Sequence, residues 1–350
     1  MSKTIQIGDR CIGQNHKVYV VAEMSANHCR SFEQAADIIR AAKYAGADAI
    51  KLQTYKPDTI TIDCNNEYFR IGKGTVWEGR TLYDLYKEAY TPWEWQPKLK
   101  KIAGELTLDL FSTPFDNTAV DFLEQMAVPA YKIASFELVD IPLIQRVAQT
   151  GKPIIMSTGM ATLAEIDEAV KAAREAGCKE LILLKCTSAY PADPGEMNLR
   201  TIPHMSEGFG VPVGLSDHTL GIAVPVAAVS LGACVIEKHL TLSRSISSPD
   251  SAFSLEPHEF KAMVESIRIT EKALGRVSYQ VANQEGASRI FRRSLFVVND
   301  MKEGDIFNQD NIRSIRPGYG LSPKCTGLVY GKIAKQDIKA GTPLNWNMVR

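Results

Sequence analysis

Short apolar runs alternate with amphipathic segments over the first 275 residues. In the amphipathic segments the apolar positions recur at helical spacing. Within residues 163–176, for example, Ile166 and Val170 share one face, and Gly177 suits the C-terminal cap. Eight apolar runs have the length and composition of buried strands: residues 18–23, 49–53, 110–113, 131–135, 154–158, 181–187, 213–217 and 234–239. The pattern predicts repeated β/α units.

The spacing of the runs predicts how these units assemble. From residue 113 to residue 239, successive run ends lie about 22 or 30 residues apart, which leaves room for a strand, a helix and two loops. A (β/α)8 barrel typically occupies about 250 residues. The repeats therefore predict the α/β class and a TIM barrel over residues 1–275, with the active site at the C-terminal ends of the strands.

After Gly275 the β/α rhythm ends. Residues 276–291 are polar and are predicted to form a linker. Residues 292–350 contain short strand-like runs, such as 294–298, and turns rich in glycine and proline, such as 316–320. The sequence therefore predicts a small, β-rich C-terminal domain.

Two histidines carry the clearest chemical signal. His218 and His239 each end a strand-like run, one β/α repeat apart. A pair of histidines is more often structural than metal-binding, but their position at strand ends in a predicted barrel favours a metal site.

Other polar residues cluster at the same strand ends. A charged residue at the end of a buried strand is costly unless it is paired or functional. Lys51 and Lys132 could instead form strand-end salt bridges. The remaining polar residues at or just after strand ends include Glu23, Gln53, Thr113, Ser135, Glu137, Ser157, Lys185, Ser188, Ser216 and Asp217.

The charge balance bears on possible partners. The chain has 40 Lys and Arg against 40 Asp and Glu, so we expect a small-molecule substrate and no nucleic acid or membrane partner. Residues 1–10 lack the apolar core of a signal peptide, and the longest apolar stretch, 222–236, is shorter than the ~20 residues of a membrane span. Seven cysteines without a close CxxC pair suit reduced thiols. We therefore expect a cytoplasmic protein.

Eight short segments, in chain order, resemble the motifs of the sialic acid synthase family. The tail segment Arg316-Pro-Gly-Tyr-Gly resembles the family's antifreeze-like (SAF) domain. Within the family, segments 82–89, 91–95 and 249–255 are most similar to those of pseudaminic acid synthases. The eight segments are Ala22-Glu-Met-Ser-Ala-Asn-His, Lys51-Leu-Gln-Thr-Tyr, Phe111-Ser-Thr-Pro-Phe-Asp, Tyr131-Lys-Ile-Ala-Ser-Phe-Glu, Met156-Ser-Thr-Gly, Lys185-Cys-Thr-Ser-Ala-Tyr-Pro, Gly214-Leu-Ser-Asp-His and Glu237-Lys-His-Leu.

The resemblance implies a condensation of phosphoenolpyruvate with an open-chain N-acetylated amino sugar, which yields a nine-carbon α-keto acid and inorganic phosphate. For Tyr190, packing beside Pro191 is an equally good explanation. The implied phosphoenolpyruvate-binding residues are Lys51, Thr113, Lys132, Ser135, Ser157, Ser188 and Ser216, and the implied sugar-binding residues are Gln53, Glu137, Tyr190, Asp250 and Arg316.

The resemblance also implies catalytic roles for Glu23, His218 and His239. The two histidines would hold a divalent metal, Mn2+ in the first place with Mg2+ or Co2+ as alternatives, and the metal would polarise the aldehyde. Glu23 is our first choice for activating water, ahead of Glu137 and Asp250.

In the family the C-terminal domain crosses to a partner subunit. The resemblance therefore implies a domain-swapped homodimer in which Arg316 reaches the other chain's site and contacts the sugar's N-acetyl group. The alternative is a solvated arginine, because Arg-Pro-Gly is ordinary turn chemistry.

Residues 55–108 form an insertion rich in aromatic side chains. We expect this segment and residues 251–254 to fit a 2,4-diacetamido-2,4,6-trideoxy sugar, whose methyl group favours an apolar wall. Packing of the loop onto the barrel would explain most of these aromatics equally well. After His28 the chain departs from its relatives with Cys29 and Arg30.

Two other classes stay open from the residues alone. A Schiff-base aldolase would use a strand-end lysine, Lys51, Lys132 or Lys185, as its nucleophile and would release no phosphate. A noncatalytic sugar-binding protein would use the tail as its recognition module, but it would not require the pair of histidines beside a ring of anion donors.

Overall fold

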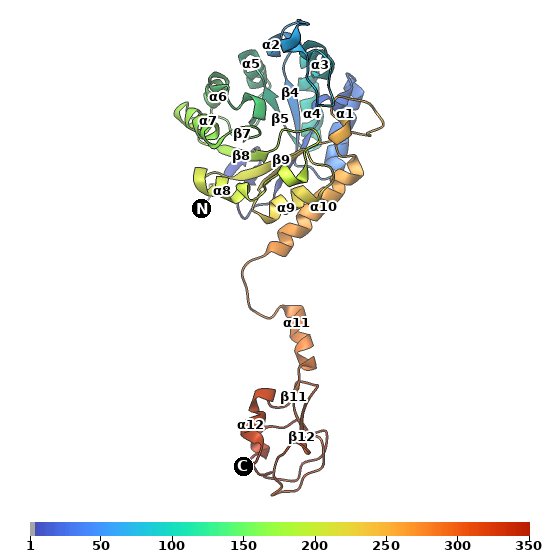
Figure 1. Cartoon of the computed structure of the whole chain (residues 1–350), viewed down its shortest axis with the longest axis vertical. Helices are drawn as coiled ribbons and strands as arrows, with labels where there is room; N and C mark the ends of the chain where they lie inside the picture. The colour runs from blue at the N-terminus through green and yellow to red at the C-terminus, as the bar shows by residue number, and fades with distance from the viewer. Residues whose placement is uncertain (1–3) are drawn as a thin grey trace. The chain divides into compact units, whose positions relative to one another are not determined.

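The computed structural model describes residues 4–350, and within this range eight parallel strands close into a barrel (Figure 1). The neighbour order is β10-β3-β4-β5-β6-β7-β8-β9, so the last strand pairs with the first. This confirms the predicted (β/α)8 barrel. The strands are β3 Tyr19–Glu23, β4 Ala49–Thr54, β5 Asp109–Pro114, β6 Tyr131–Ile133, β7 Ile154–Ser157, β8 Leu181–Cys186, β9 Val213–Asp217 and β10 Val235–His239.

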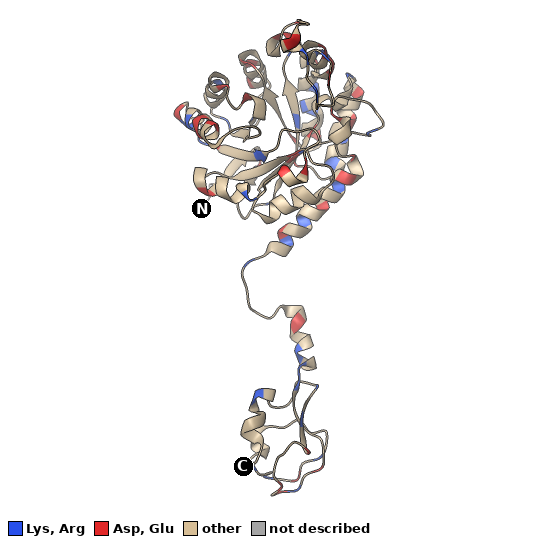
Figure 2. Ribbon diagram, viewed as in Figure 1, with Lys and Arg blue, Asp and Glu red and all other residues tan. Residues whose placement is uncertain are grey.

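Helices cover the outside of the barrel and bury their apolar stripes against it. Side-chain caps fix several helix starts; Thr162 and Glu165, for example, form a capping box at α7. Figure 2 shows acidic and basic residues interspersed on these helices. They are α1 Phe32–Tyr44, α4 Gln96–Glu105, α5 Asn117–Gln125, α6 Ile141–Ala148, α7 Leu163–Glu175, α8 Thr201–Phe209, α9 Ala223–Ser230 and α10 Pro257–Leu274.

Strand alternation decides which side chains face the barrel interior. Val21 and Val235 belong to the interior apolar cluster. Because successive strand residues point to opposite faces, Glu23, Glu237 and His239 face the same side further along their strands. The interior is therefore apolar near the middle of the strands and polar at their C-terminal ends.

A short hairpin closes the other end of the barrel. Strands β1 Ile5–Ile7 and β2 Arg10–Ile12 pair antiparallel, and Ile5, Ile7 and Ile12 join the interior apolar cluster. No apolar run or motif in the sequence predicted this hairpin. It supplies the apolar floor that the N-terminal ends of the strands need.

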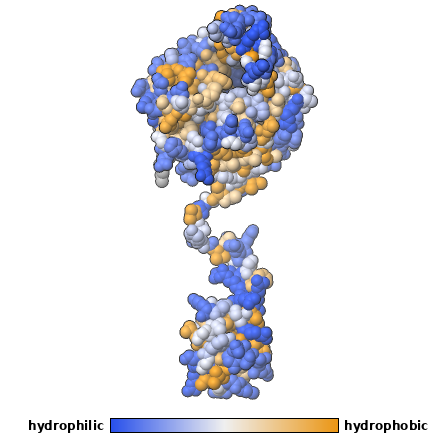
Figure 3. Space-filling view, viewed as in Figure 1, coloured by the Kyte–Doolittle hydropathy of each residue, from blue (hydrophilic) through white to orange (hydrophobic). Residues whose placement is uncertain are grey.

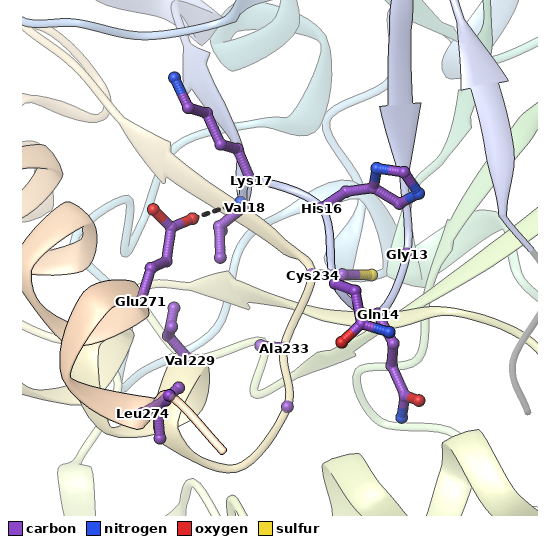
Figure 4. Close-up of a pocket in the computed structure, with 13 residues that line it drawn as sticks. Gly13, Gln14, His16, Lys17, Val18, Val229, Ala233, Cys234, Glu271 and Leu274 are labelled. Atoms are coloured by element: carbon purple, nitrogen blue, oxygen red, sulfur yellow. Dashed lines mark hydrogen bonds between the residues drawn. The ribbon is translucent and has the colours of Figure 1, made fainter.

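A cavity of about 450 Å³ lies near this end, beside the segments that enter β3 and β10 (Figure 4). Its lining includes His16, Lys17, Cys234 and Glu271, and a carboxylate oxygen of Glu271 accepts a hydrogen bond from the backbone N–H of Val18 at 2.5 Å. The cavity is thus at the opposite ends of the strands from the predicted polar residues.

The insertion between β4 and β5 is folded onto the barrel. Trp93 donates a hydrogen bond to the carbonyl of Tyr55, and Thr91 contacts the buried His28 ring at 3.2 Å. The surface around α2 and α3 is mainly hydrophilic (Figure 3). The helical elements of the insertion that precede α4 are α2 Pro57–Ile60, η2 Glu67–Phe69, α3 Leu82–Ala89 and η3 Trp93–Trp95.

Residues 276–350 form a second compact unit. Strands β11 Ser294–Val297 and β12 Ile312–Ile315 pair antiparallel over a core that includes Leu295, Phe307 and Leu344. The segment predicted as a linker contains short helices, and its exact limits stay a prediction. The helices of this unit are α11 Asn283–Ser288, η7 Arg289–Phe291, η8 Pro323–Cys325, α12 Thr326–Val329 and η9 Trp346–Met348.

The remaining helical turns of the barrel domain follow strand ends. They are η1 Ser25–His28, η4 Ser135–Glu137, η5 Pro194–Glu196 and η6 Ser251–Phe253. Strand β6 ends at Ile133, so Ser135 begins a 3-10 turn instead of ending the strand as predicted. In residues 4–350, each helix is too short or too polar to cross a membrane.

Candidate functional site

Four buried charged residues form a network at the C-terminal ends of the strands. Lys51 lies between two carboxylates, with its Nζ 3.1 Å from Glu23 Oε2 and 3.0 Å from Glu237 Oε1. Lys132 Nζ lies 3.3 Å from the same Glu237 oxygen. All four side chains are at most 5% exposed. The network is electrically balanced, which makes its burial tolerable.

The network separates the protonation behaviour of its two carboxylates. Burial by itself would raise the pKa of Glu237, but Lys132 and Lys51 together lower it to about 2. Burial raises the pKa of Glu23, and Lys51 only partly offsets this effect. Glu237 is therefore a fixed anion, whereas Glu23 is a carboxylate that can take up a proton.

The two lysines also differ. Burial by itself would lower the pKa of Lys51, but its two carboxylate neighbours raise it above the ordinary value. Burial lowers the pKa of Lys132, and Glu237 offsets this only in part.

The third strand-end lysine, Lys185, lies outside this network. It belongs to the opposite face of β8 from the interior residue Leu184, and its Nζ donates a hydrogen bond to the carbonyl of Cys186.

Hydroxyl groups surround the charged network. Ser216 donates to Glu237 at 3.2 Å, and Ser135 accepts from the backbone N–H of Gly159 at 3.0 Å. A Cβ at Gly159 would lie 2.2 Å from Ser188 Oγ and 2.7 Å from Ser135 Oγ, so a larger residue there would displace these two hydroxyls. The buried hydroxyls of Thr113 and Ser157 have no hydrogen-bond partner among residues 4–350.

The two predicted metal-binding histidines lie side by side. Their ring centroids are 5.4 Å apart, and the pair is buried. The Nδ1 of His218 lies 3.0 Å from the carbonyl oxygen of Thr187, to which its N–H can donate a hydrogen bond, so that Nε2 keeps a lone pair for a metal. The Nδ1 of His239 is buried and has no hydrogen-bond partner in the described range. Burial, followed by His218, lowers the pKa of His239 well below its usual value.

Aromatic side chains form a wall beside the histidines. The ring centroid of Tyr190 lies 4.4 Å from that of His218 and 5.1 Å from that of Phe253. Trp77, from the β4–β5 insertion, packs on Tyr190 at 5.5 Å and donates to the carbonyl of Pro249 at 2.9 Å. The insertion thus contributes directly to the surroundings of the histidines.

The structure brings together most of the predicted sugar-binding residues. Asp250 Oδ2 lies 4.0 Å from His239 Nδ1, and burial raises the pKa of Asp250. Gln53 donates to Glu23 at 3.1 Å. Burial raises the pKa of Glu137 to about 7. Arg316 belongs to the second compact unit, where its side chain is exposed.

Sequence reasoning did not assign a role to several residues of this cluster. Glu237 lies two positions before His239, so strand alternation could have placed it on the same face. Cys186 lies in a strand-like apolar run and had no assigned role, and its Sγ is 3.9 Å from His218 Nδ1. Phe253 lies in the segment 251–254 that was predicted to fit the sugar, but its contact with His239, at 5.0 Å between ring centroids, depends on a loop after β10 and was not predicted.

The closed barrel and its polar mouth define a class of (β/α)8-barrel proteins with a buried, cation-lined site beside two histidines. A model of the NeuB family matches residues 38–279, and a model of the SAF domain matches residues 292–350. The chain belongs to the NeuB family. This confirms the family and the C-terminal SAF domain expected from the motifs.

Individual relatives match over nearly the whole chain. Pseudaminic acid synthase of Campylobacter jejuni (strain 81-176) is 46% identical over 340 residues, which cover 97% of this chain and 98% of the relative. Pseudaminic acid synthase of Helicobacter pylori (strain 26695) is 43% identical over 327 residues, covering 93% and 96%. The crystal structure of N-acetylneuraminic acid synthetase from Leptospira borgpetersenii, in complex with citrate, is 31% identical with a TM-score of 0.73, covering 82% of this chain and 95% of that one.

Proposed function

We propose that this chain is a pseudaminic acid synthase. It would condense phosphoenolpyruvate and water with 2,4-diacetamido-2,4,6-trideoxy-L-altrose, giving pseudaminic acid and inorganic phosphate. Two relatives of that name share 46% and 43% of their residues with it over almost their full length. The single structural observation that carries the proposal is the buried Lys51–Glu237–Lys132 network beside the paired histidines.

The cations and hydroxyls suit the two anionic groups of phosphoenolpyruvate. Lys51 and Lys132 supply positive charge in a water-poor setting, where charge-assisted hydrogen bonds are strong. The partnerless hydroxyls of Thr113 and Ser157 are donors that a bound anion would satisfy. Ser135, Ser188 and Ser216 complete the proposed set of phosphoenolpyruvate contacts.

The donor set at the histidines fits a divalent metal. His218 presents Nε2 because its Nδ1 faces a backbone carbonyl, and His239 has a buried, partnerless Nδ1. No group of three or more His, Cys, Asp or Glu suited to a metal occurs between residues 4 and 350, so oxygen atoms from water and substrate would complete the coordination. When bound there, Mn2+ or a similar ion would supply Lewis acidity toward the sugar aldehyde.

The chain's own residues account for the remaining chemistry. In the proposed reaction C3 of phosphoenolpyruvate bonds to the aldehyde carbon, and the aldehyde oxygen becomes a hydroxyl. Water adds at C2, and its proton passes to Glu23, whose raised pKa makes it a base able to accept that proton. Phosphate then leaves through cleavage of its bond to C2, and the second proton of the added water goes to the phosphate as C2 becomes the keto carbon. The proton held by Glu23 goes to the alkoxide left at the former aldehyde carbon, which makes it the hydroxyl. Lys51, 3.1 Å from Glu23, keeps the carboxylate oriented.

The aromatic wall suits the proposed acceptor. Trp77, Tyr190 and Phe253 offer apolar surface next to the histidines, and a 6-deoxy sugar has a methyl group where N-acetylmannosamine carries a hydroxyl. Glu137 and Asp250 would contact the acetamido groups and hydroxyls. Its raised pKa lets Glu137 act as a hydrogen-bond donor below about pH 7.

We further propose a domain-swapped homodimer in which Arg316 serves the partner's site. Exposed apolar side chains follow the C-terminal ends of the adjacent strands β6 and β7, where a partner could cover them; they are Phe136, Val139, Met160 and Leu163. The SAF domain has its own core, as a module that docks on another subunit requires.

Mixing two inactive variants tests the exchange. Arg316→Ala has an intact barrel, and His239→Ala has an intact tail. In a swapped heterodimer the intact barrel receives the intact Arg316, so co-refolded variants regain part of the wild-type activity. In an unswapped arrangement every site keeps one defect, and activity stays at the level of the separate variants. That second result would overturn the exchange.

Phosphate release from phosphoenolpyruvate tests the function itself. The assay offers the altrose-derived sugar, N-acetylmannosamine and the acceptor of legionaminic acid synthases in parallel, with Mn2+ and with EDTA. We expect metal-dependent turnover of the altrose-derived sugar alone. Preference for another sugar would reassign the acceptor. Absence of phosphate release with every sugar, together with trapping of a lysine by borohydride, would replace the synthase with a Schiff-base aldolase.

A further inference from the structure

Lys238 and Asp217 form an ion pair on the outer side of the barrel wall, behind the two histidines. Both side chains are 0% exposed. Lys238 and Asp217 are register partners on the adjacent strands β10 and β9. They point away from the barrel interior, because Ile236 and Leu215, two residues earlier on each strand, belong to the apolar layer beneath the helices.

This ion pair also fixes the backbone on both sides of His218. Asp217 accepts hydrogen bonds from the backbone N–H of Thr219 at 3.0 Å and from its hydroxyl at 3.1 Å. Lys238 donates to the carbonyl of Thr219 in addition to Asp217. His218 lies between Asp217 and Thr219 in the chain, and Lys238 directly precedes His239. One ammonium group therefore links the backbones that carry both imidazoles.

Stability alone does not explain such a pair. Removing two charges from water is costly, and apolar residues of similar volume often replace a buried ion pair without loss of stability. Buried ionic groups are best understood where they fix a register or an orientation. Here the fixed elements are the strand ends that carry His218 and His239, whose ring centroids lie 5.4 Å apart.

We propose that Lys238 and Asp217 are positioning residues that hold the two imidazoles at the separation and orientation needed to bind one divalent cation. The inference rests on the metal site of the proposed function. Neither residue touches substrate or metal. They act through the backbone, as groups behind metal ligands do elsewhere, where their loss typically weakens metal affinity 10- to 100-fold.

Metal binding to the purified full-length protein tests this role directly. Mn2+ is titrated into the protein while the electron paramagnetic resonance signal of free Mn2+ is followed, and thermal unfolding is measured on the same samples. The variant Asp217→Leu/Lys238→Met replaces the ion pair with apolar residues of similar size. We expect its dissociation constant for Mn2+ to rise 10- to 100-fold while its Tm stays close to that of the wild type.

A matched control removes an ion pair at the opposite ends of the strands. Arg10 Nη1 lies 2.7 Å from Asp109 Oδ2, and Arg10→Met/Asp109→Asn removes that pair while keeping a hydrogen-bond acceptor for Tyr19. We expect this variant to bind Mn2+ like the wild type, whatever its Tm. An equal loss of affinity in the control would show a general loosening of the fold and would overturn the specific role.

The same titration separates this inference from the proposed function. If the wild type and His218→Ala/His239→Ala bind Mn2+ alike, the histidine metal site itself is wrong. If the double histidine variant loses binding but Asp217→Leu/Lys238→Met keeps the wild-type dissociation constant, the positioning role is wrong. If Asp217→Leu/Lys238→Met does not fold, the titration uses Asp217→Asn, which keeps the volume of the side chain. We expect about tenfold weaker binding from it, and unchanged binding would overturn the inference.

Discussion

Lys132 Nζ and Lys51 Nζ share one oxygen of Glu237, at 3.3 Å and 3.0 Å, at the polar end of the barrel interior. One buried carboxylate thus balances two buried ammonium groups, with Glu23 as a further partner of Lys51. An incoming dianion can take over this balancing role. The network therefore links the stability of the free protein to the binding of an anionic substrate.

Replacing Glu237 by glutamine should expose that link. Glu237→Gln leaves two buried cations without their shared anion, so we expect the free energy of unfolding to fall by about 3–5 kcal/mol. Phosphoenolpyruvate or phosphate should then raise the Tm of the variant more than that of the wild type. The measurement is thermal unfolding with and without ligand.

A surface ion pair provides the control for Glu237→Gln. Glu124 Oε1 lies 2.6 Å from Lys152 Nζ, and both side chains are partly exposed. In Glu124→Gln we expect the free energy of unfolding to fall by less than about 1 kcal/mol. The ligand should raise the Tm of this variant as much as that of the wild type. An equal ligand response in Glu237→Gln and the wild type would contradict the proposed anion site.

Removing the partnerless hydroxyl of Thr113 should separate binding from stability. In Thr113→Val a methyl group replaces the buried Oγ1, which has no hydrogen-bond partner within residues 4–350, so the free protein should be as stable as the wild type or more stable. A hydrogen bond to a charged group contributes about 1.5–3 kcal/mol, so the KM for phosphoenolpyruvate should rise at least about tenfold. Thr118→Val, at an exposed helix start, serves as the comparison, and an unchanged KM in Thr113→Val would remove Thr113 from the site.

Glu137 should impose a pH dependence on stability. Burial raises its pKa to about 7 in the folded protein, whereas a glutamate in an unfolded chain titrates near 4.3. Between about pH 4.3 and pH 7 the folded state retains a proton that the unfolded state has released. The contribution of Glu137 to the free energy of unfolding therefore falls as the pH rises through this window.

Glu137→Gln has no such proton to lose. Its Tm should therefore vary less than that of the wild type between pH 5 and pH 8. The exposed Glu207→Gln should keep the wild-type slope. Parallel profiles of Tm against pH for Glu137→Gln and the wild type would show that Glu137 is already ionised at pH 5 in both the folded and the unfolded state. That result would contradict the prediction.

Trp77 should affect the acceptor sugar and not phosphoenolpyruvate. Its indole packs on Tyr190 and is held by the carbonyl of Pro249. In Trp77→Ala we expect the KM for the sugar to rise about tenfold, equivalent to about 1.4 kcal/mol, with the KM for phosphoenolpyruvate unchanged. Tyr68, exposed on the same insertion, should have little effect when changed to alanine. A shift in both KM values for Trp77→Ala would indicate collapse of the loop instead.

The amino-acid sequence by itself determined the fold class and the end of the barrel at which the polar residues gather. Apolar runs at regular spacing predicted the barrel, because each buried strand and amphipathic helix leaves its own periodic pattern. The motifs identified the family. The positions of His218 and His239 at the ends of strand-like runs predicted that they would lie close together, because strand ends converge in a barrel whatever fills the loops.

Only the tertiary structure decided which charged groups meet. Barrel closure pairs β10 with β3, which brings Glu237 to Lys51 across more than 180 positions of sequence. The sequence could not show that Glu237 is the shared anion, since pKa values follow from burial and from neighbours in space. For the same reason the outward Lys238–Asp217 pair and the contact of Trp77 with Tyr190 were invisible. They depend on strand register and loop packing, which no local pattern encodes.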